Sequence, residues 1–157
     1  IAKKVFKRLE PFGVHCVAYD PYIDKNSVAE FKIELIDFEK LLQLSNIISI
    51  HLPLTNETKE LINKDTFKKM TKSPIIINTS RGSIINEYDM LEAYSENLIA
   101  GFALDVYDQE PVEKKLYDQI TNDMNCILTP HIAGVTEESN FRVSKFIAES
   151  TIKFFKN

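Results

Sequence analysis

The chain has few of the residues that mark specialised protein classes. It has only two cysteines, Cys16 and Cys126, too few for a disulfide framework and too far apart for a zinc site. We therefore expect reduced thiols, no metal site and a cytoplasmic location. Lysine and arginine number 19 against 23 acidic residues, and the resulting net charge of −4 argues against a nucleic-acid partner.

Long apolar runs and flexible linkers are also missing. No run approaches the roughly 18 apolar residues of a membrane span, so we expect no membrane partner. The 157 residues contain only four glycines, no repeat and no low-complexity segment, which predicts one domain. The first residue is Ile1 rather than methionine, so we expect the natural N-terminus to lie upstream.

Apolar periodicity alternates along the chain between strand-like and helix-like segments. The expected strands cover residues 16–19, 33–35, 47–50, 75–77, 99–106 and 126–128. The expected helices cover residues 1–12, 38–44, 63–70 and 87–96, with a long closing helix capped by Thr136. The stretch from Asp108 to Asn125 holds a short helix at best. The alternation predicts a Rossmann-type, doubly wound α/β fold with a parallel sheet covered on both faces.

Polar residues gather where the expected strands end, namely Asp20, His51, Arg81, Asp105, Glu110 and His131. One aspartate after a strand is commonly a turn residue. Several titratable groups at the carboxyl edge of a parallel sheet are harder to explain this way, because ligands bind at that edge. The pattern therefore predicts a ligand site there.

Asp20 is a candidate for binding an adenosine ribose. A carboxylate at the end of the second strand of such a fold accepts hydrogen bonds from both ribose hydroxyls and repels a 2′-phosphate, which favours NAD over NADP. The glycine loop that should precede it by about 20 residues would fall before Ile1. From the residues alone, Asp20 is therefore only a hint.

Arg81, Glu110 and His131 are the candidates for chemistry. An arginine in a cleft can bind a carboxylate bidentately, although a surface salt bridge is the simpler alternative. A carboxylate bonded to one imidazole nitrogen leaves the other free to move a proton. Asp108 competes with Glu110 for the carboxylate role, and His131 as a structural histidine is an equally good interpretation.

These residues lie in segments that resemble the D-isomer-specific 2-hydroxyacid dehydrogenases from Ile1 to about Phe155. The matching segments are residues 18–22 (AYDPY), 51–55 (HLPLT), 78–82 (NTSRG), 100–107 (AGFALDVY), 110–111 (EP) and 129–134 (TPHIAG). The resemblance implies that Arg81 holds the keto acid, that Glu110 supports the catalytic histidine, and that His131 is that histidine. Together they would form the catalytic set.

The resemblance also implies a set of NAD-contacting residues. They are Ile1, Asp20, Leu52, Pro53, Thr58, Thr79, Ser80, Arg81, Asp105, His131 and Gly134. Asp105 would contact the nicotinamide carboxamide. Ile1 and Ala2 align with the last two defined positions of the family's Gly-x-Gly-x-Ile-Gly loop. Residues 1–157 would then be the NAD-binding domain, cut within that loop and lacking the substrate domain.

The implied activity is NAD-dependent interconversion of a D-2-hydroxy acid and a 2-keto acid, with His131 as general acid and base, in a homodimer. The alternative is an NAD(H)-sensing module of the corepressor kind, which keeps the same residues without turnover. A phospho-acceptor domain with a flavodoxin-like sheet fits poorly, because Pro130 and His131 stand where a lysine should follow the last strand.

Overall fold

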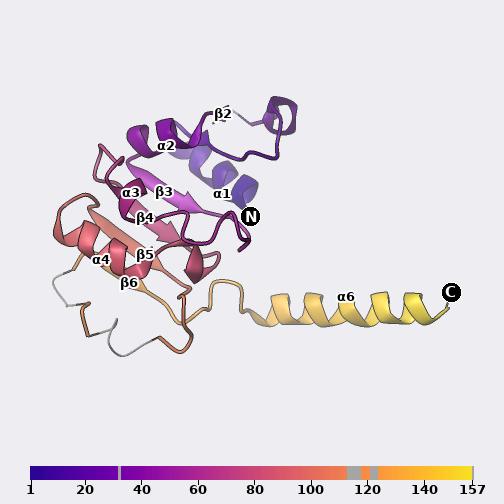
Figure 1. Cartoon of the computed structure of the whole chain (residues 1–157). Helices are drawn as coiled ribbons and strands as arrows, with labels where there is room; N and C mark the ends of the chain where they lie inside the picture. The colour runs from indigo at the N-terminus through magenta and orange to yellow at the C-terminus, as the bar shows by residue number, and fades with distance from the viewer. Residues whose placement is uncertain (32, 113–117, 121–123, 157) are drawn as a thin grey trace.

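The computed structural model describes residues 1–31, 33–112, 118–120 and 124–156 (Figure 1). Its strands are β1 (Val17–Ala18), β2 (Glu34–Leu35), β3 (Ile47–Ile50), β4 (Ile75–Asn78), β5 (Gly101–Leu104) and β6 (Cys126–Leu128). Its helices are α1 (Ala2–Leu9), α2 (Phe38–Leu44), α3 (Lys64–Phe67), α4 (Glu87–Ser95) and α6 (Glu137–Lys156), with 3-10 turns at Glu10–Phe12, Lys25–Val28 and Gly82–Ile84. Part of the irregular stretch expected after Asp108 lies outside the described residues.

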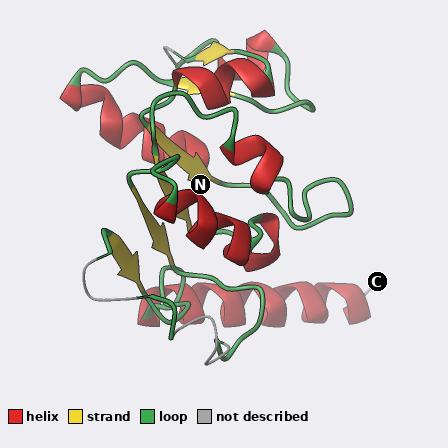
Figure 2. Cartoon of the chain, turned by 60° about the vertical axis from the view of Figure 1, so that its left-hand side comes forward, coloured by secondary structure: helices red, strands yellow, loops and turns green. Residues whose placement is uncertain are grey.

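All strand pairs are parallel, and the predicted Rossmann-type α/β fold is confirmed. β3, β4, β5 and β6 form one sheet in that order, while β1 and β2 form a separate pair. Figure 2 shows this pair at the top of the view, apart from the larger sheet below it. Within the described residues, β1 pairs only with β2, and β3 pairs only with β4. The strands therefore form two sheets rather than one.

One face of the larger sheet is packed into the main core. Its buried side chains are Ile48, Ile50, Ile76, Phe102 and Leu104, each at most 7% exposed. Leu42 of α2, Phe67 of α3 and Met90 of α4 belong to the same cluster. Burying an aliphatic or aromatic side chain of this size contributes about 1.5–3 kcal/mol to the stability of the fold. The packing of this face therefore stabilises the sheet whose carboxyl edge carries the expected ligand site.

The opposite face is partly open, which differs from the predicted coverage of both faces. Ile47 and Ile127 are 60% and 67% exposed. α6 carries an apolar stripe but buries none of its residues, and it extends away from the body of the chain (Figure 1). The stripe indicates an apolar face without specifying what covers it.

Side-chain caps set the starts of the helices. Asp37 accepts the Lys40 N–H at 2.8 Å, and Thr136 accepts the Ser139 N–H at 3.0 Å. Each satisfies a backbone donor that the first helical turn leaves without a partner. The predicted N-cap Thr136 is therefore confirmed, and Asp37 caps α2 in the same way. Of the helices in the described part of the chain, none has the length and apolar composition needed to cross a bilayer.

Candidate active site

Asn78, the last residue of β4, shapes the loop that carries Arg81. Its side chain is 1% exposed. The amide nitrogen donates to the Arg81 carbonyl at 2.9 Å, and the amide oxygen accepts from the Ser80 N–H at 3.0 Å and the Ser80 hydroxyl at 2.8 Å. A buried amide with this set of partners holds the loop in one conformation.

Gly82 brings this loop against the segment that follows β5. A Cβ added to Gly82 would lie 1.8 Å from the carbonyl carbon of Tyr107 and 2.3 Å from the nitrogen of Asp108. Only glycine permits so close an approach of two backbones. The Ser83 hydroxyl also donates to the Asp108 carboxylate. The loops after β4 and β5 are therefore joined side by side.

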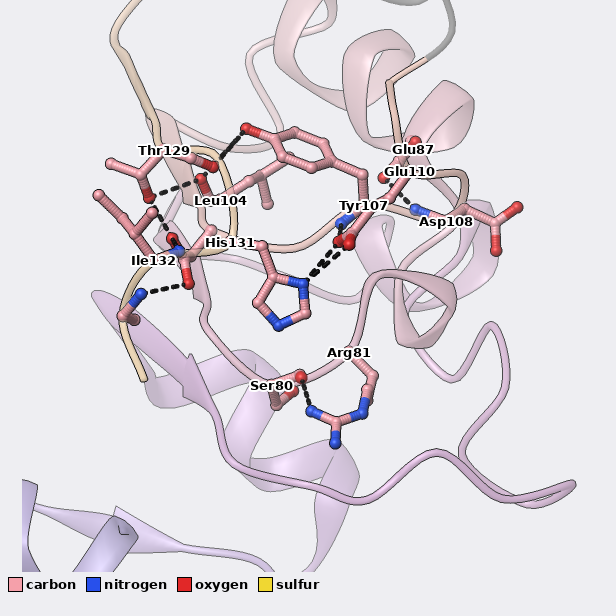
Figure 3. A network of polar contacts seen from close by, with 12 residues as sticks. Ser80, Arg81, Glu87, Leu104, Tyr107, Asp108, Glu110, Thr129, His131 and Ile132 are labelled. Atoms are coloured by element: carbon pink, nitrogen blue, oxygen red, sulfur yellow. Dashed lines mark hydrogen bonds and ion pairs between the residues drawn. The ribbon is translucent and has the colours of Figure 1, made fainter. Parts of the chain in front are cut away.

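Glu110 and His131 are brought into direct contact from the ends of β5 and β6. The His131 Nδ1 lies 2.8 Å from Oε2 and 3.0 Å from Oε1 of Glu110 (Figure 3). The Tyr107 N–H donates to Glu110 Oε1 at 3.2 Å. The His131 hydrogen bond, and then the Tyr107 hydrogen bond, lower the pKa of the Glu110 carboxyl. The ionised carboxylate thus occupies Nδ1 and leaves Nε2 free.

Asp105 holds the loop that carries His131. Its buried carboxylate, 3% exposed, accepts the Thr129 hydroxyl at 2.6 Å and the Ile132 and Ala133 N–H groups at 2.9 Å each. Burial by itself raises the pKa of Asp105, but these hydrogen bonds outweigh it and the pKa is lowered. The three donors lie on both sides of His131 in the sequence. The φ of His131 is 54°, a left-handed conformation that costs a non-glycine residue roughly 1–2 kcal/mol.

Arg81 lies beside this pair without bonding to it in the described structure. Its guanidinium donates to the Ser80 carbonyl at 2.6 Å and is exposed. Figure 3 shows the Nε2 edge of the His131 ring directed toward the Ser80–Arg81 segment. A free imidazole nitrogen and an exposed cation facing one space can bind an anion that carries a proton-accepting oxygen.

The expected ribose acid, Asp20, lies at a separate hollow. Asp20 is half-buried after β1, and its carboxylate accepts the Tyr22 N–H at 3.0 Å. The hollow has a volume of about 580 Å³ and is lined by Asp20, Ile23, Asp24, Glu34, Leu35, Ile36, Asp37 and Lys40. It does not include Glu110 or His131, so an elongated ligand would be needed to reach both places.

The loop after β3 carries three further candidates in a closed turn. The Thr58 hydroxyl donates to the Pro53 carbonyl at 2.6 Å and accepts the Thr55 N–H at 2.8 Å. Leu52 packs against the main core. His51, just before it, has its pKa lowered by burial. Ile1, directly before α1, is exposed.

The remaining candidates, Thr79 and Gly134, are exposed. Sequence reasoning gave no role to three residues that shape the site: Asn78, Tyr107 and Glu87. Asn78 offered a signal, because it is a polar residue that ends an apolar strand. Glu87 offered none, because an acid in the first turn of a helix is ordinary. Its burial, at 8% exposure, appears only in the structure.

The chain matches a known protein family over most of its length. The family model described as the NAD-binding domain of D-isomer-specific 2-hydroxyacid dehydrogenases matches residues 1–133. Among curated relatives, the D-3-phosphoglycerate dehydrogenase of Archaeoglobus fulgidus is 36% identical over 98% of the chain, and the glyoxylate reductase of Thermofilum pendens is 39% identical over 96%. The chain spans 29% and 44% of the lengths of these two relatives.

Solved structures give the same result for the fold. The crystal structure of D-lactate dehydrogenase from Aquifex aeolicus, complexed with NAD and lactic acid, superposes with a TM-score of 0.87 at 26% identity. The superposition covers 98% of this chain and 50% of that one. The similarity therefore extends over nearly all of this chain and half of that enzyme.

Proposed function

Because this chain belongs to the D-isomer-specific 2-hydroxyacid dehydrogenase family, as its NAD-binding domain, we propose that the whole protein interconverts a D-2-hydroxy acid and a 2-keto acid. The observation that carries the proposal is the 2.8 Å contact between His131 Nδ1 and Glu110 Oε2. It leaves one imidazole nitrogen free at the edge of the sheet, beside the Arg81 loop.

We assign the proton transfer to His131. In the reducing direction, Nε2 donates its proton to the keto oxygen as C2 receives a hydride, so the carbonyl becomes a hydroxyl. In the reverse direction, Nε2 accepts the hydroxyl proton as the hydride leaves C2. Glu110 supports this role because its carboxylate stabilises the protonated ring and fixes the ring's orientation.

We assign binding of the substrate carboxylate to Arg81. Its guanidinium is exposed and has a carbonyl as its partner, an interaction that a bidentate carboxylate would replace with a stronger one. Binding there would set the adjacent C2 carbonyl near His131. The orientation of the substrate would then be set by two groups: the Arg81 guanidinium, which binds the carboxylate, and the His131 imidazole, which faces the C2 oxygen.

The residues of this chain fit NAD, which when bound supplies or accepts the hydride. We propose that Asp20 binds the adenosine ribose, and that Leu52, Pro53 and Thr58 line the adenosine side. Ile1, Thr79, Ser80, Asp105 and Gly134 would contact the rest of the dinucleotide. The carboxylate of Asp20 in an open hollow supports this assignment, because a vicinal diol offers two donors to it.

We further propose that the whole protein carries a glycine loop just upstream of Ile1, a second, substrate-binding domain, and a homodimeric assembly in the cytoplasm. The unpaired thiols of Cys16 and Cys126 support the location. Residues 1–157 alone should then bind NAD weakly, and calorimetry that gave a micromolar dissociation constant would contradict this. Sedimentation of the whole protein checks the assembly.

The decisive experiment replaces His131 by alanine in the whole protein. We expect NADH turnover with a panel of 2-keto acids to be abolished, while NADH binding measured by fluorescence persists. Near wild-type turnover in the variant would refute the role of His131. Tight NADH binding by the wild-type protein without turnover of any keto acid would instead favour the sensing module.

A further inference from the structure

Glu87 is an unusual residue for the first turn of a helix, because its side chain is buried. Among the described residues, the buried polar side chains are those of Asn78, Glu87 and Asp105. Asn78 and Asp105 shape the loops of Arg81 and His131, respectively. Burying a carboxylate costs free energy unless hydrogen bonds compensate for the lost hydration. The buried Glu87 carboxylate therefore needs hydrogen-bond donors that compensate for its lost hydration.

One such donor is a backbone N–H of the segment after β5. Glu87 Oε1 accepts the Asp108 N–H at 2.8 Å. Ser83, four residues before Glu87, donates its hydroxyl hydrogen to the Asp108 carboxylate. Asp108, which lies between β5 and Glu110, is thus held at its backbone by the first residue of α4 and at its side chain by Ser83, in the segment that joins β4 to α4.

The segment held in this way also holds Glu110. The Tyr107 N–H, one residue before Asp108, donates to Glu110 Oε1 at 3.2 Å. Figure 3 shows Glu87, Asp108 and Glu110 grouped on the side of the His131 ring where its Nδ1 contacts Glu110. A displacement of the Asp108 backbone would carry Tyr107 with it and weaken the support of the Glu110 carboxylate.

We propose that Glu87 is a positioning residue for the Glu110–His131 pair. By holding the Asp108 N–H, Glu87 keeps the turn of residues 107–110 in the place from which Glu110 reaches His131 Nδ1. The inference rests on the proposed function, since it assigns Glu87 an effect on proton transfer. Glu87 does so through the backbone of this turn rather than by contact with a substrate.

A purely structural role for Glu87 makes a different prediction. Its loss would then lower the melting temperature and leave the turnover number of the folded enzyme unchanged. A positioning role instead lowers kcat while leaving the KM for NADH unchanged, because the adenosine side of the site lies on other loops. Misplacing a reacting group by about an ångström costs up to roughly 100-fold in rate.

The test uses the whole protein with Glu87→Ala, Glu87→Gln and Glu87→Asp. Alanine removes the acceptor, glutamine keeps an oxygen at the same reach, and aspartate withdraws the carboxylate by one methylene. We expect kcat for keto-acid reduction to fall about tenfold or more in the alanine and aspartate variants and to be largely retained in the glutamine variant. The KM for NADH should stay within about twofold in all three.

Asp89→Ala is the matched control. Asp89 lies on the same helix, and its carboxylate accepts the Lys64 N–H at 2.8 Å, so it anchors α3 in the way that Glu87 anchors Asp108. We expect its kcat to match the wild type. An equal loss in the control would overturn the proposal, as would a folded Glu87→Ala or Glu87→Asp variant with wild-type kcat. If Glu87→Ala does not fold, the comparison of aspartate with glutamine decides. Absence of turnover in the wild-type protein would instead overturn the proposed function.

Discussion

Gly82 and Tyr107 lie so close that a methyl group on Gly82 would fall 1.8 Å from the Tyr107 carbonyl carbon. This contact joins the loop that carries Arg81 to the turn that carries Glu110. Since Glu110 in turn contacts His131, the three candidate groups are linked by one close approach of two backbones. The distance between those backbones thus sets the spacing between the arginine and the acid–base pair.

Replacing Gly82 by alanine should separate these loops. No flexible side chain is in the way to yield, because the atoms that the new Cβ would meet are backbone atoms. We expect the whole protein to lose about 1–3 kcal/mol of stability, as overpacked sites do, and to lose most of its keto-acid reduction. Urea denaturation and kcat measure the two effects. Gly13→Ala is the contrasting variant: φ at Gly13 is 67°, but no atom lies within 4 Å of the added Cβ. It should be destabilised by backbone strain while keeping kcat.

Asp105 should make stability depend on pH in the acidic range. Its pKa is lowered in the folded chain relative to the ordinary aspartate value of 3.8. A group with a depressed folded pKa binds its proton more readily when unfolded, so its stabilising contribution is present above the unfolded pKa and is lost as pH falls through the folded pKa. We expect the free energy of unfolding to decline below about pH 4 for this reason.

The variant Asp105→Asn isolates that contribution. An amide offers one acceptor oxygen where the carboxylate offers two, so either the Ala133 N–H or the pair of donors on Oδ1 is left without a full partner. At neutral pH the loss should be about 1–3 kcal/mol. Below pH 4 the difference between variant and wild type should shrink. A gap that stayed constant from pH 7 to pH 3 in urea titrations would contradict this account.

Much of the fold could be predicted because buried strands reveal themselves by composition. Ile47–Ile50 and Ile75–Ile77 are apolar runs closed by polar residues, and both appear as strands at the expected places. The parallel order followed from the alternation with helices. The meeting of Glu110 and His131, although 21 residues apart, was expected from the resemblance, and the contact is present. Their chemical roles stay predictions.

Other features depend on tertiary packing and could not be read from the chain. The burial of Glu87 depends on where the Asp108 backbone lies, and an acid at a helix start carries no sign of it. The exposure of α6 was hidden for a similar reason: Val143, Phe146 and Ile147, at the helical spacing i, i+3 and i+4, predict an apolar stripe, but periodicity does not say what covers it. The separation of β1 and β2 from the larger sheet likewise depends on which strands form hydrogen bonds with one another, and the sequence pattern does not specify this.

α6 should be the least protected helix in residues 1–157 expressed alone. None of its residues is buried, and its acidic start and basic end stabilise it only by tenths of a kcal/mol. Most of the stability of a helix in a protein comes from tertiary packing of its apolar face, and in residues 1–157 the apolar face of α6 is not buried. We expect its amide hydrogens to exchange far faster than those of β4 and β5 in hydrogen-exchange mass spectrometry. Equal protection of α6 and β4 would show that the helix gains its stability elsewhere, for instance from self-association of the exposed aromatic residues.

Asp20 should set the choice between NAD and NADP. Its carboxylate has one bonded backbone donor, the Tyr22 N–H, and otherwise faces the open hollow after β1. In Asp20→Asn of the whole protein we expect the dissociation constant for NADH to rise about tenfold, since hydrogen bonds to a charged group are worth about 1.5–3 kcal/mol each. Binding of NADPH should tighten, because the repulsion of its 2′-phosphate is removed.

Asp24→Asn separates a direct contact from a general effect of negative charge. Asp24 lines the same hollow, and its side chain caps the turn at Lys25–Val28 by accepting the Ser27 N–H at 2.8 Å. Asparagine also caps well, so this variant removes one negative charge from the hollow and keeps the local fold. If Asp20 binds the ribose directly, Asp24→Asn should change NADH affinity less than about twofold at physiological salt, where charges beyond about 8 Å are largely screened. Similar changes in both variants, measured by fluorescence titration, would mean that the overall field of the hollow, and not Asp20 itself, discriminates between the two dinucleotides.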